Sequence, residues 1–484
     1  MFRTITFLAM LLMLPLVCGA DEPKKPAVPA EPAPANPPHE TPEIVRLTVQ
    51  PMAAPIPALK YQLLPELSEM NPGNPIQGYL KCFMEENKFF FGKQAEEDRD
   101  KWLEMPLKDL PLEKIRNWGY FGSPLTQADD AARLDTPDWQ VLLKLKSEGI
   151  RLLVPDVQEI RKIVIALKVR FRAEIAARQF DKAIVTAKTM FAMSRHFCEH
   201  PTVVGDLYGF EVVVMALDSL EEMIQQPSCP NLYWALTDLP SPLVSIYKGL
   251  QGDRTTLANE FPQLDGNSRL TDAELLTLVD RLDDSIDLTP PGSMKRGDVR
   301  KSLQAKANEE KNLDAARERL ANAGFDPIKL KEFLPLQVVL LDEVLAFNEL
   351  RDDDSKAMML PYWQVQSVLA ANRAKKSENG RGRESIFVFL LPPVGVRAEQ
   401  VRLEQRIALL RCVEALRLYA SEHDGRLPEH LDDVQVPVPI DPVSGKPFSY
   451  RVDGATATVR GTLVTREASD TRRNTNLYEA TMKK

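Results

Sequence analysis

The feature that most constrains this chain is a run of helical apolar spacing between residues 156 and 226, divided by two short breaks. A first helix is predicted to begin at Asp156, which can cap it, and to end near residue 177. A second helix follows to about residue 199, and a third, mostly apolar helix begins at Val203. Amphipathic helices joined by such short breaks predict antiparallel hairpins and a mainly α-helical fold.

The second of these helices carries an apolar face that should pack on its neighbours. The face consists of Ile184, Ala187, Met190, Phe191, Phe197 and Cys198. The preceding junction, residues 176–184, resembles the turn of a tetratricopeptide-type hairpin, but no second copy follows at the repeat's period of about 34 residues. Because solenoids need several stacked copies, the resemblance implies irregular antiparallel helical hairpins, tetratricopeptide-like only in part.

Composition and spacing divide the middle of the chain into three parts. Helical patterning covers residues 58–265, which we expect to form one helical domain. Residues 266–298 are polar, although Thr271 and Glu274 can form a capping box, so we expect a linker with a short helix. Helical spacing returns over residues 299–384, and this segment should pack on the first domain.

The C-terminal part switches from helical to alternating spacing. A helix is predicted from about residue 397 to residue 422, followed by a turn-rich stretch over residues 424–447. Apolar residues then alternate on both sides of Asp453 and Gly454, a hairpin turn signal. We therefore expect residues 385–464 to form a small α+β module, a long helix plus a short β-hairpin or meander.

Packing inside this module can be predicted from the same pattern. Leu416 and Tyr419 on the helix should be buried under Phe448 and Tyr450 on the β-element. If Tyr450 is a core residue, replacing it with alanine should cost about 3 kcal/mol.

Both ends of the chain differ from the helical and α+β regions between them. Residues 1–20 have the layout of a cleaved signal peptide, with a basic residue, an apolar run and small residues before the cleavage site. Residues 21–57 hold 11 of the 38 prolines, which predicts a disordered tether. Residues 465–484 should form a disordered tail. We expect an exported protein, periplasmic or extracellular, either free or peripherally attached to the envelope, without a transmembrane segment after cleavage.

The charge of the chain limits the class of binding partner, and its cysteine content bears on disulfide formation. The chain has 61 basic and 69 acidic residues, a net charge of −8, which argues against a nucleic-acid partner. Four cysteines remain after cleavage, and export permits disulfides. Their spacing leaves open whether any of them pair: Cys82, Cys198, Cys229 and Cys412.

The sharpest chemical pattern is His196, Glu199 and His200, which matches the inverted zinc-peptidase sequence H-x-x-E-H. Zinc chemistry needs both imidazoles on one helix face and the carboxylate near the metal-bound water. Pro201, however, disfavours helical geometry at His200. The pattern therefore has two interpretations, a zinc site and a polar helix terminus, and we favour the second.

Aromatic residues supply candidate interaction sites. Two adjacent pairs and one strand residue could stack on sugars or on a protein partner: Tyr233 with Trp234, Tyr362 with Trp363, and Tyr450. The leucines and prolines around the pairs favour the alternative that they are buried helix anchors. The signatures G-x-S-x-G, Walker A, G-x-G-x-x-G and paired C-x-x-C do not occur, so no catalytic residue and no cofactor is assigned.

Two resemblances are carried by particular residues. Residues 415–428, with Leu431 and residues 441–450, resemble the globular end of type II secretion major pseudopilins over about 50 residues. In that family the helix continues from an N-terminal membrane segment with a prepilin cleavage motif, which this chain lacks, so assembly into a fibre is not implied. Residues 230–240 and 360–363, together with the C-terminal module, are similar to a family of exported, uncharacterised helical proteins of planctomycete bacteria. That resemblance implies secretion and helical architecture, and no activity.

These observations favour a non-catalytic exported protein, an envelope scaffold or protein-interaction protein. Its partner would be another envelope protein or a cell-wall component. The alternative is a zinc-dependent hydrolase that uses His196, Glu199 and His200.

Overall fold

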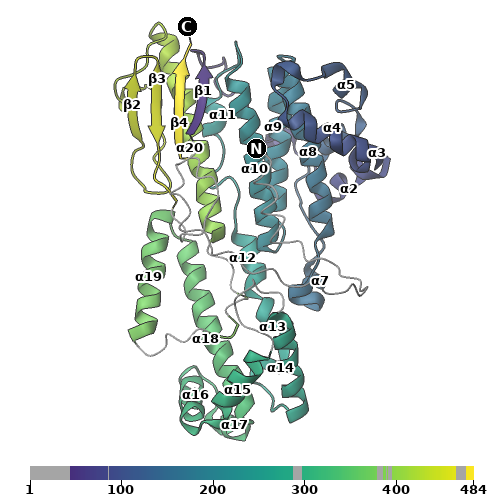
Figure 1. Cartoon of the computed structure of the whole chain (residues 1–484), viewed down its shortest axis with the longest axis vertical. Helices are drawn as coiled ribbons and strands as arrows, with labels where there is room; N and C mark the ends of the chain where they lie inside the picture. Colours follow the sequence, from purple (N-terminus) through teal and green to yellow (C-terminus); the bar gives the residue numbers. More distant parts are fainter. Residues whose placement is uncertain are drawn as a thin grey trace, which may run out of the picture.

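The computed structural model describes residues 44–85, 87–286, 297–378, 385–387, 390, 395–464 and 476–483. The expected signal peptide, residues 21–43 of the expected tether and residues 465–475 of the expected tail lie outside this part of the chain. The described chain is mainly helical with one small four-stranded sheet, which confirms the predicted fold class (Figure 1).

The three helices predicted first form the centre of the molecule. They are α8 (Pro155–Ala176), α9 (Phe180–Phe197) and α10 (Val203–Ile224), and each packs on the other two. The turn between α8 and α9 is closed by Arg178, which adopts a positive φ of 59°. Asp156 lies in the first turn of α8 rather than at its cap, because the helix begins one residue earlier at Pro155. There its charge still favours the positive end of the helix dipole.

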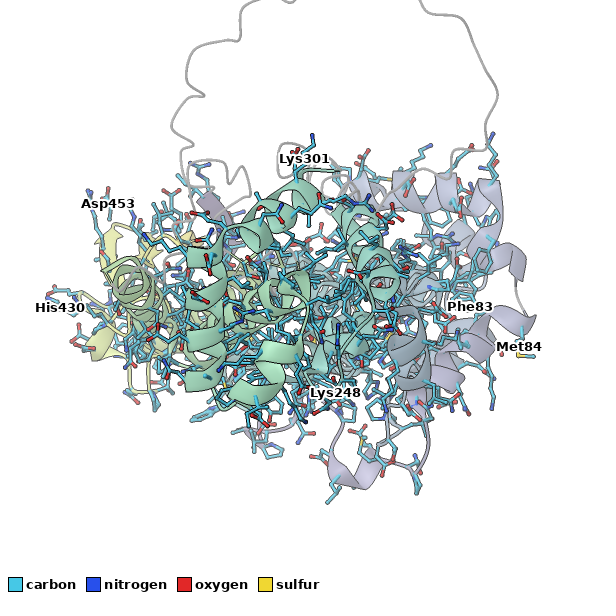
Figure 2. The ribbon with its side chains drawn as sticks, turned by 90° about the horizontal axis from the view of Figure 1, so that it is seen from below. Phe83, Met84, Lys248, Lys301, His430 and Asp453 are labelled. Atoms are coloured by element: carbon cyan, nitrogen blue, oxygen red, sulfur yellow. The ribbon has the colours of Figure 1, made fainter. Side chains whose placement is uncertain are left out.

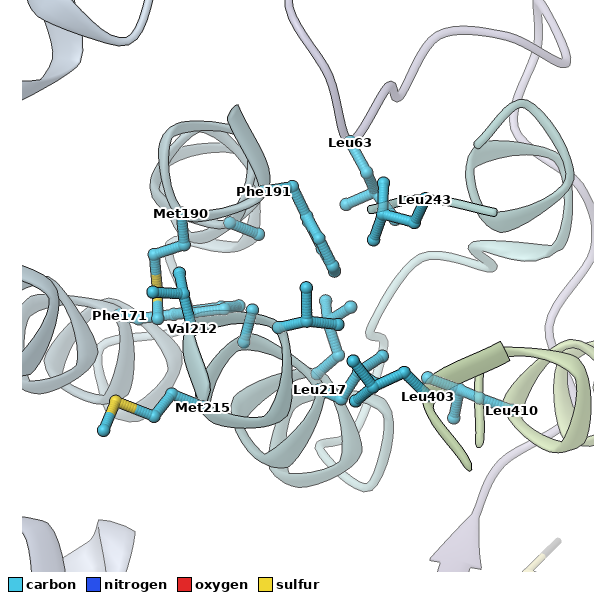
Figure 3. Close-up of a cluster of buried hydrophobic side chains, with 14 of the residues drawn as sticks. Leu63, Phe171, Met190, Phe191, Val212, Met215, Leu217, Leu243, Leu403 and Leu410 are labelled. Atoms are coloured by element: carbon cyan, nitrogen blue, oxygen red, sulfur yellow. The ribbon is translucent and has the colours of Figure 1, made fainter. Parts of the chain in front are cut away.

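The predicted apolar face of α9 is buried in the main core. Figure 3 shows Met190 and Phe191 of α9 beside Phe171 of α8 and Val212 of α10, and all four are at most 2% exposed. Leu403 and Leu410 of a C-terminal helix enter the same cluster. Full burial of such side chains stabilises the fold by about 1.5–3 kcal/mol each.

Shorter helices cover the central three. Those on the N-terminal side are α2 (Pro75–Glu85), α3 (Asn87–Phe91), α4 (Lys93–Glu104), α5 (Leu112–Asn117) and α6 (Ser123–Ala131), whereas α7 (Leu142–Glu148) contacts α13 (Thr256–Glu260) farther along the chain. Those that follow α10 are α11 (Tyr233–Thr237) and α12 (Tyr247–Arg254). Together with the C-terminal elements, they build one continuous apolar core, and we call this part the main body.

A second core lies at the other end of the molecule, in what we call the lower lobe (Figure 1). Its helices are α13 (Thr256–Glu260), α14 (Asp272–Ile286), α15 (Asp298–Asn308), α16 (Glu310–Asn322), α17 (Pro327–Glu332) and α18 (Pro335–Met358). The expected capping box is present, since the Glu274 carboxylate accepts from the Thr271 backbone N–H at 2.8 Å and the Thr271 hydroxyl accepts from the Glu274 N–H.

The lobe corrects two expectations about the middle of the chain. The short helix expected in the polar linker is present as α14, but the linker interpretation is wrong for residues 272–286, because α14 buries Leu275, Val279 and Leu282 in the lower core. The expected boundary at residue 265 does not separate two cores, because Leu257, Phe261 and Leu264 share this core with α14 and with the helices after residue 298. A segment that is polar on average can therefore contain an amphipathic helix, and the apolar face of α14 packs on the other helices of the lower lobe.

The C-terminal module contains α19 (Tyr362–Glu378), α20 (Gly395–Glu422) and the sheet. The predicted hairpin is formed by β2 (Ser449–Asp453) and β3 (Thr456–Arg460). Two further strands complete the sheet, β1 (Ile44–Val49) and β4 (Leu477–Met482), in the order β1-β4-β3-β2. The expected tether and tail are thus wrong for these segments, which pair in parallel from Ile44 opposite Leu477.

Two arginines of α20 attach the C-terminal module to the other helices of the main body. Arg417 is fully buried and donates to the Glu414 carboxylate at 2.7 Å and to the carbonyl oxygens of Cys229 and Gln50. Arg406 donates to the carboxylates of Asp218 and Glu221 on α10 at 2.7–2.9 Å. Charged hydrogen bonds between buried groups are costly to break, so the module and the body form one unit.

Two further observations concern the described residues. Cys82, Cys198, Cys229 and Cys412 are buried as free thiols. Among the helices in this part of the chain, none has the length and apolar character needed to cross a bilayer.

Candidate functional site

The residues of the zinc-like pattern do not converge. The ring of His196 is buried, and its Nδ1 lies 2.8 Å from the Tyr79 hydroxyl oxygen. The backbone carbonyl of His196 accepts a hydrogen bond from the Trp139 indole. Burial, with the nearby Arg195 charge, lowers the pKa of His196 to about 3. A neutral imidazole bonded to Tyr79 is a core residue of the α2–α9 contact.

The other two residues of the pattern point elsewhere. Glu199 is half-exposed and pairs with Lys248 of α12 at 2.9 Å. His200 lies beyond the end of α9, is fully buried and places its Nδ1 2.8 Å from the Thr202 hydroxyl. No three His, Cys, Asp or Glu side chains in the described chain could jointly hold a metal ion. The zinc interpretation is therefore not supported by the geometry.

A small hollow of about 220 Å³ lies beside Glu199, lined also by Cys198, Tyr247 and Lys248. Burial raises the pKa of the Cys198 thiol well above its usual value, and the nearby Glu199 charge acts in the same direction. The thiol therefore stays protonated at neutral pH, and a protonated thiol is a poor nucleophile.

A buried carboxyl group lies behind this hollow, and none of the sequence motifs pointed to it. Asp206 in the first turn of α10 is fully buried, and neither carboxyl oxygen has a hydrogen-bond partner within the described residues. Burial, with the charges of Asp253 and Glu199, raises its pKa to about 9. It faces Gly249 of α12, where any side chain would overlap the carboxyl group. Asp206 is thus held neutral by the close approach of two helices.

The predicted aromatic pairs are mainly anchors. Tyr233 is fully buried and its hydroxyl donates to the Pro437 carbonyl, while the edge of its ring meets Trp234. Tyr362 is 5% exposed and belongs to a small core under α20. Trp363 is half-exposed but covers Gly445, which has a positive φ of 68° and no room for a side chain. These residues fix the module in place.

Tyr450, the last predicted interaction residue, lines a groove. We call it the C-terminal groove; its volume is about 290 Å³. It is lined by Glu429, His430, Leu431, Asp432, Val438, Pro439, Ile440, Pro447, Phe448 and Tyr450. Figure 2 shows His430 at the outer end of the module, well apart from Lys248 near the other hollow.

Hydrogen bonds hold the walls of this groove. The Tyr450 hydroxyl donates to the Pro428 carbonyl at 2.8 Å, and the His430 N–H donates to the Asp433 carboxylate at 2.8 Å. The segment that leads to Pro439 is tied to α11 through Tyr233 and Pro437. Because these contacts are satisfied within the protein, the groove is preformed.

Asp441 organises the loop between two walls of the groove. Its carboxylate accepts from Gln405 of α20 at 2.8 Å, from the Thr462 N–H at 2.8 Å, and from Val443 and Ser444. Burial opposes ionisation of this carboxyl group, but these hydrogen bonds outweigh it and lower the pKa of Asp441. The loop is therefore anchored to α20 by an ionised, fully bonded side chain.

The groove combines an apolar floor with an acidic rim. Phe448 is buried, Tyr450 is half-buried and Ile440 is 53% exposed. The rim contributes Glu429 and Asp432, both exposed, whereas no lysine or arginine lines the groove. This arrangement suits a ligand with apolar groups and positive charge.

Sequence reasoning identified one residue of this groove and missed the buried Asp206. The burial expected for the module is correct for Leu416 and Phe448, but Tyr419 and Tyr450 stay partly exposed, because one side of each faces solvent. The available signal for Asp206 was a single charged residue within the otherwise uncharged first two turns of α10, residues 203–210. Nothing in the local pattern brings residues 429–432 beside Pro439 and Phe448.

Comparisons of the chain with protein-family models, with curated proteins and with solved structures find no match.

Proposed function

We propose that this protein is a non-catalytic, exported envelope scaffold whose C-terminal module binds a partner through the C-terminal groove. One observation carries the proposal: a preformed groove with an apolar floor and an acidic rim lies at the outer end of a module that is fastened to the body. Concave, mainly apolar sites with a few polar groups are the common form of binding sites.

The attachment of the module supports a scaffold. Arg417 and Arg406 link α20 to the body by buried charged hydrogen bonds, and Tyr478 of β4 donates to Glu221 on α10. A partner bound at the groove would therefore be held at a defined position relative to α8–α10. A flexibly joined module would not provide this geometry.

Export is part of the proposal, and it has a separate test. If the signal peptide is removed as expected, N-terminal sequencing of protein purified from the source bacterium should begin at Asp21. A chain that begins at Met1 and fractionates with the cytoplasm would contradict export.

The interaction role is tested by changing the groove without disturbing the fold. We expect Ile440→Lys to abolish recovery of partners from envelope extracts, because it removes an exposed apolar contact and adds a positive charge. The matched control is Ile328→Lys in the lower lobe, where the side chain is 70% exposed and far from the groove. Equal recovery by both variants and the unchanged chain would overturn the proposal.

A further inference from the structure

The C-terminal groove favours a particular kind of ligand. Its floor presents Tyr450 and Phe448 beside Pro439 and Pro447, and its rim presents two carboxylates. Aromatic-lined grooves bind proline-rich segments in the polyproline II conformation, which has a low entropic cost of ordering. The Tyr450 hydroxyl is already engaged by Pro428, so the ring is the part that remains for stacking.

The chain itself contains a segment of this chemistry. Residues 23–29 have the sequence Pro-Lys-Lys-Pro-Ala-Val-Pro, with proline at positions 23, 26 and 29. Polyproline II has about three residues per turn, so prolines at this spacing fall on one face. Lys24 and Lys25 then lie on the other two faces and supply two positive charges.

From these observations we infer that residues 23–29 of the same chain dock in the C-terminal groove, with the prolines on Tyr450 and Phe448 and the lysines toward Glu429 and Asp432. This inference rests on the interaction role proposed for the groove. It implies that an external partner must displace the chain's own segment.

The chain between residues 23–29 and β1 is long enough for the segment to reach the groove. Residues 30–43 join the segment to β1 and can span about 43 Å at about 3.1 Å per residue. The sheet order β1-β4-β3-β2 separates β1 from β2 by three strand spacings, or about 14 Å. The groove is formed partly by the start of β2, so the segment can reach it within one molecule.

Competition tests the inference in the full mature chain. The probe is a fluorescent synthetic peptide with the sequence of residues 21–31, and its binding is followed by anisotropy. A tethered segment acts at an effective concentration of the order of 1 mM. If the peptide binds with a Kd of about 0.1 mM, it should bind about tenfold more tightly to a Lys24→Glu, Lys25→Glu chain, whose own segment cannot compete.

Two controls test whether binding depends on the proline spacing of the peptide and on the acidic rim of the groove. A peptide of the same composition with adjacent prolines should not bind, and the Asp432→Lys change in the charge-reversed chain should weaken binding of the original peptide. Equal peptide affinity for the unchanged and charge-reversed chains, or equal binding of the rearranged peptide, would overturn the inference.

A failure of this inference can be distinguished from a failure of the proposed function. If Ile440→Lys loses its envelope partner while charge reversal of Lys24 and Lys25 changes neither peptide binding nor partner recovery, the groove binds partners but the internal docking is wrong. If the inference is correct, the charge-reversed chain should recover more partner than the unchanged chain, because its groove is free.

Discussion

The main body and the lower lobe stabilise their charges in different ways. In two ion pairs made by α20 in the main body, both members are withdrawn from water: Arg417 and Glu414 are 0% exposed, and Arg406 and Glu221 are each 11% exposed. In the lobe a buried carboxylate pairs with a cation that stays partly in water, as in Asp342 with Arg319, where the cation is 38% exposed. Solvent therefore moderates the pair of Arg319 and not these two pairs of α20.

The two regions also differ in how far their contacts extend along the chain. The body's core joins Leu47 and Val49 to Tyr478 and Met482, near opposite ends of the sequence. The lobe's core comes from residues 257–347 with Ile386 and Phe387. The body can therefore assemble only when distant segments meet, whereas most of the lobe is built from consecutive helices.

The largest expected difference comes from removing a buried cation. Arg417→Met should lower the free energy of unfolding by about 3–5 kcal/mol, since it leaves the Glu414 carboxylate buried without its partner. Arg319→Met should cost about 1 kcal/mol or less, because solvent reaches that pair. Urea denaturation measures both, and similar losses would remove the distinction between the two regions.

Cavities should show whether the regions unfold together. Phe191→Ala and Leu320→Ala each remove a fully buried side chain and should cost about 2–5 kcal/mol. We expect faster hydrogen exchange after Leu320→Ala to stay within residues 257–347, and faster exchange after Phe191→Ala to extend into α20 and the sheet. Exchange that accelerates throughout the chain in both variants would indicate one cooperative unit.

The buried Asp206 should give the main body a dependence on alkaline pH. Its pKa of about 9 in the folded protein exceeds the usual 3.8, so its contribution to stability is fully present below about pH 3.8 and is lost as pH rises to about 9. Between these values the slope is about 1.4 kcal/mol per pH unit. Asp206→Asn should therefore flatten the loss of stability between pH 7.5 and 8.5.

The pH window is chosen to isolate this group. Burial raises the pKa of the neighbouring Asp253 to about 7, and burial with the Lys248 charge lowers that of His200 to about 4. His196 and His200 contribute stability above pH 6.5 that is lost as pH falls, which is the opposite sign. The exposed Asp130→Asn serves as control, and a variant profile parallel to that of the unchanged chain would refute the role of Asp206.

The smallest effect is expected at the groove. The half-buried position of Tyr450 reduces the expected cost of Tyr450→Ala from about 3 to about 1–2 kcal/mol, since part of the ring already faces solvent. Tyr450→Phe should cost about 1 kcal/mol through the hydrogen bond to Pro428. Thermal or urea unfolding checks both values, and a loss of 3 kcal/mol or more would mean that Tyr450 is a core residue.

The helices were predictable because their signals are local. The spacing of Ile184, Phe191 and Phe197, the capping box of Thr271, and the stop at Asp424 and Gly425 each depend on residues within a few positions of one another. Such patterns identify which face of an element is apolar. They do not identify the element that covers it, and for that reason α14 could not be assigned to the lower lobe.

The sequence by itself determined the helical elements and the hairpin of β2 and β3, and it named Tyr450 as a candidate interaction residue. Only the tertiary structure decided that residues 44–49 pair with residues 477–482, that His196 bonds Tyr79, and that three separate segments enclose the C-terminal groove. The physical reason is that local spacing sets backbone conformation and amphipathic faces, whereas partners far apart in the chain are selected by the packing of the whole molecule.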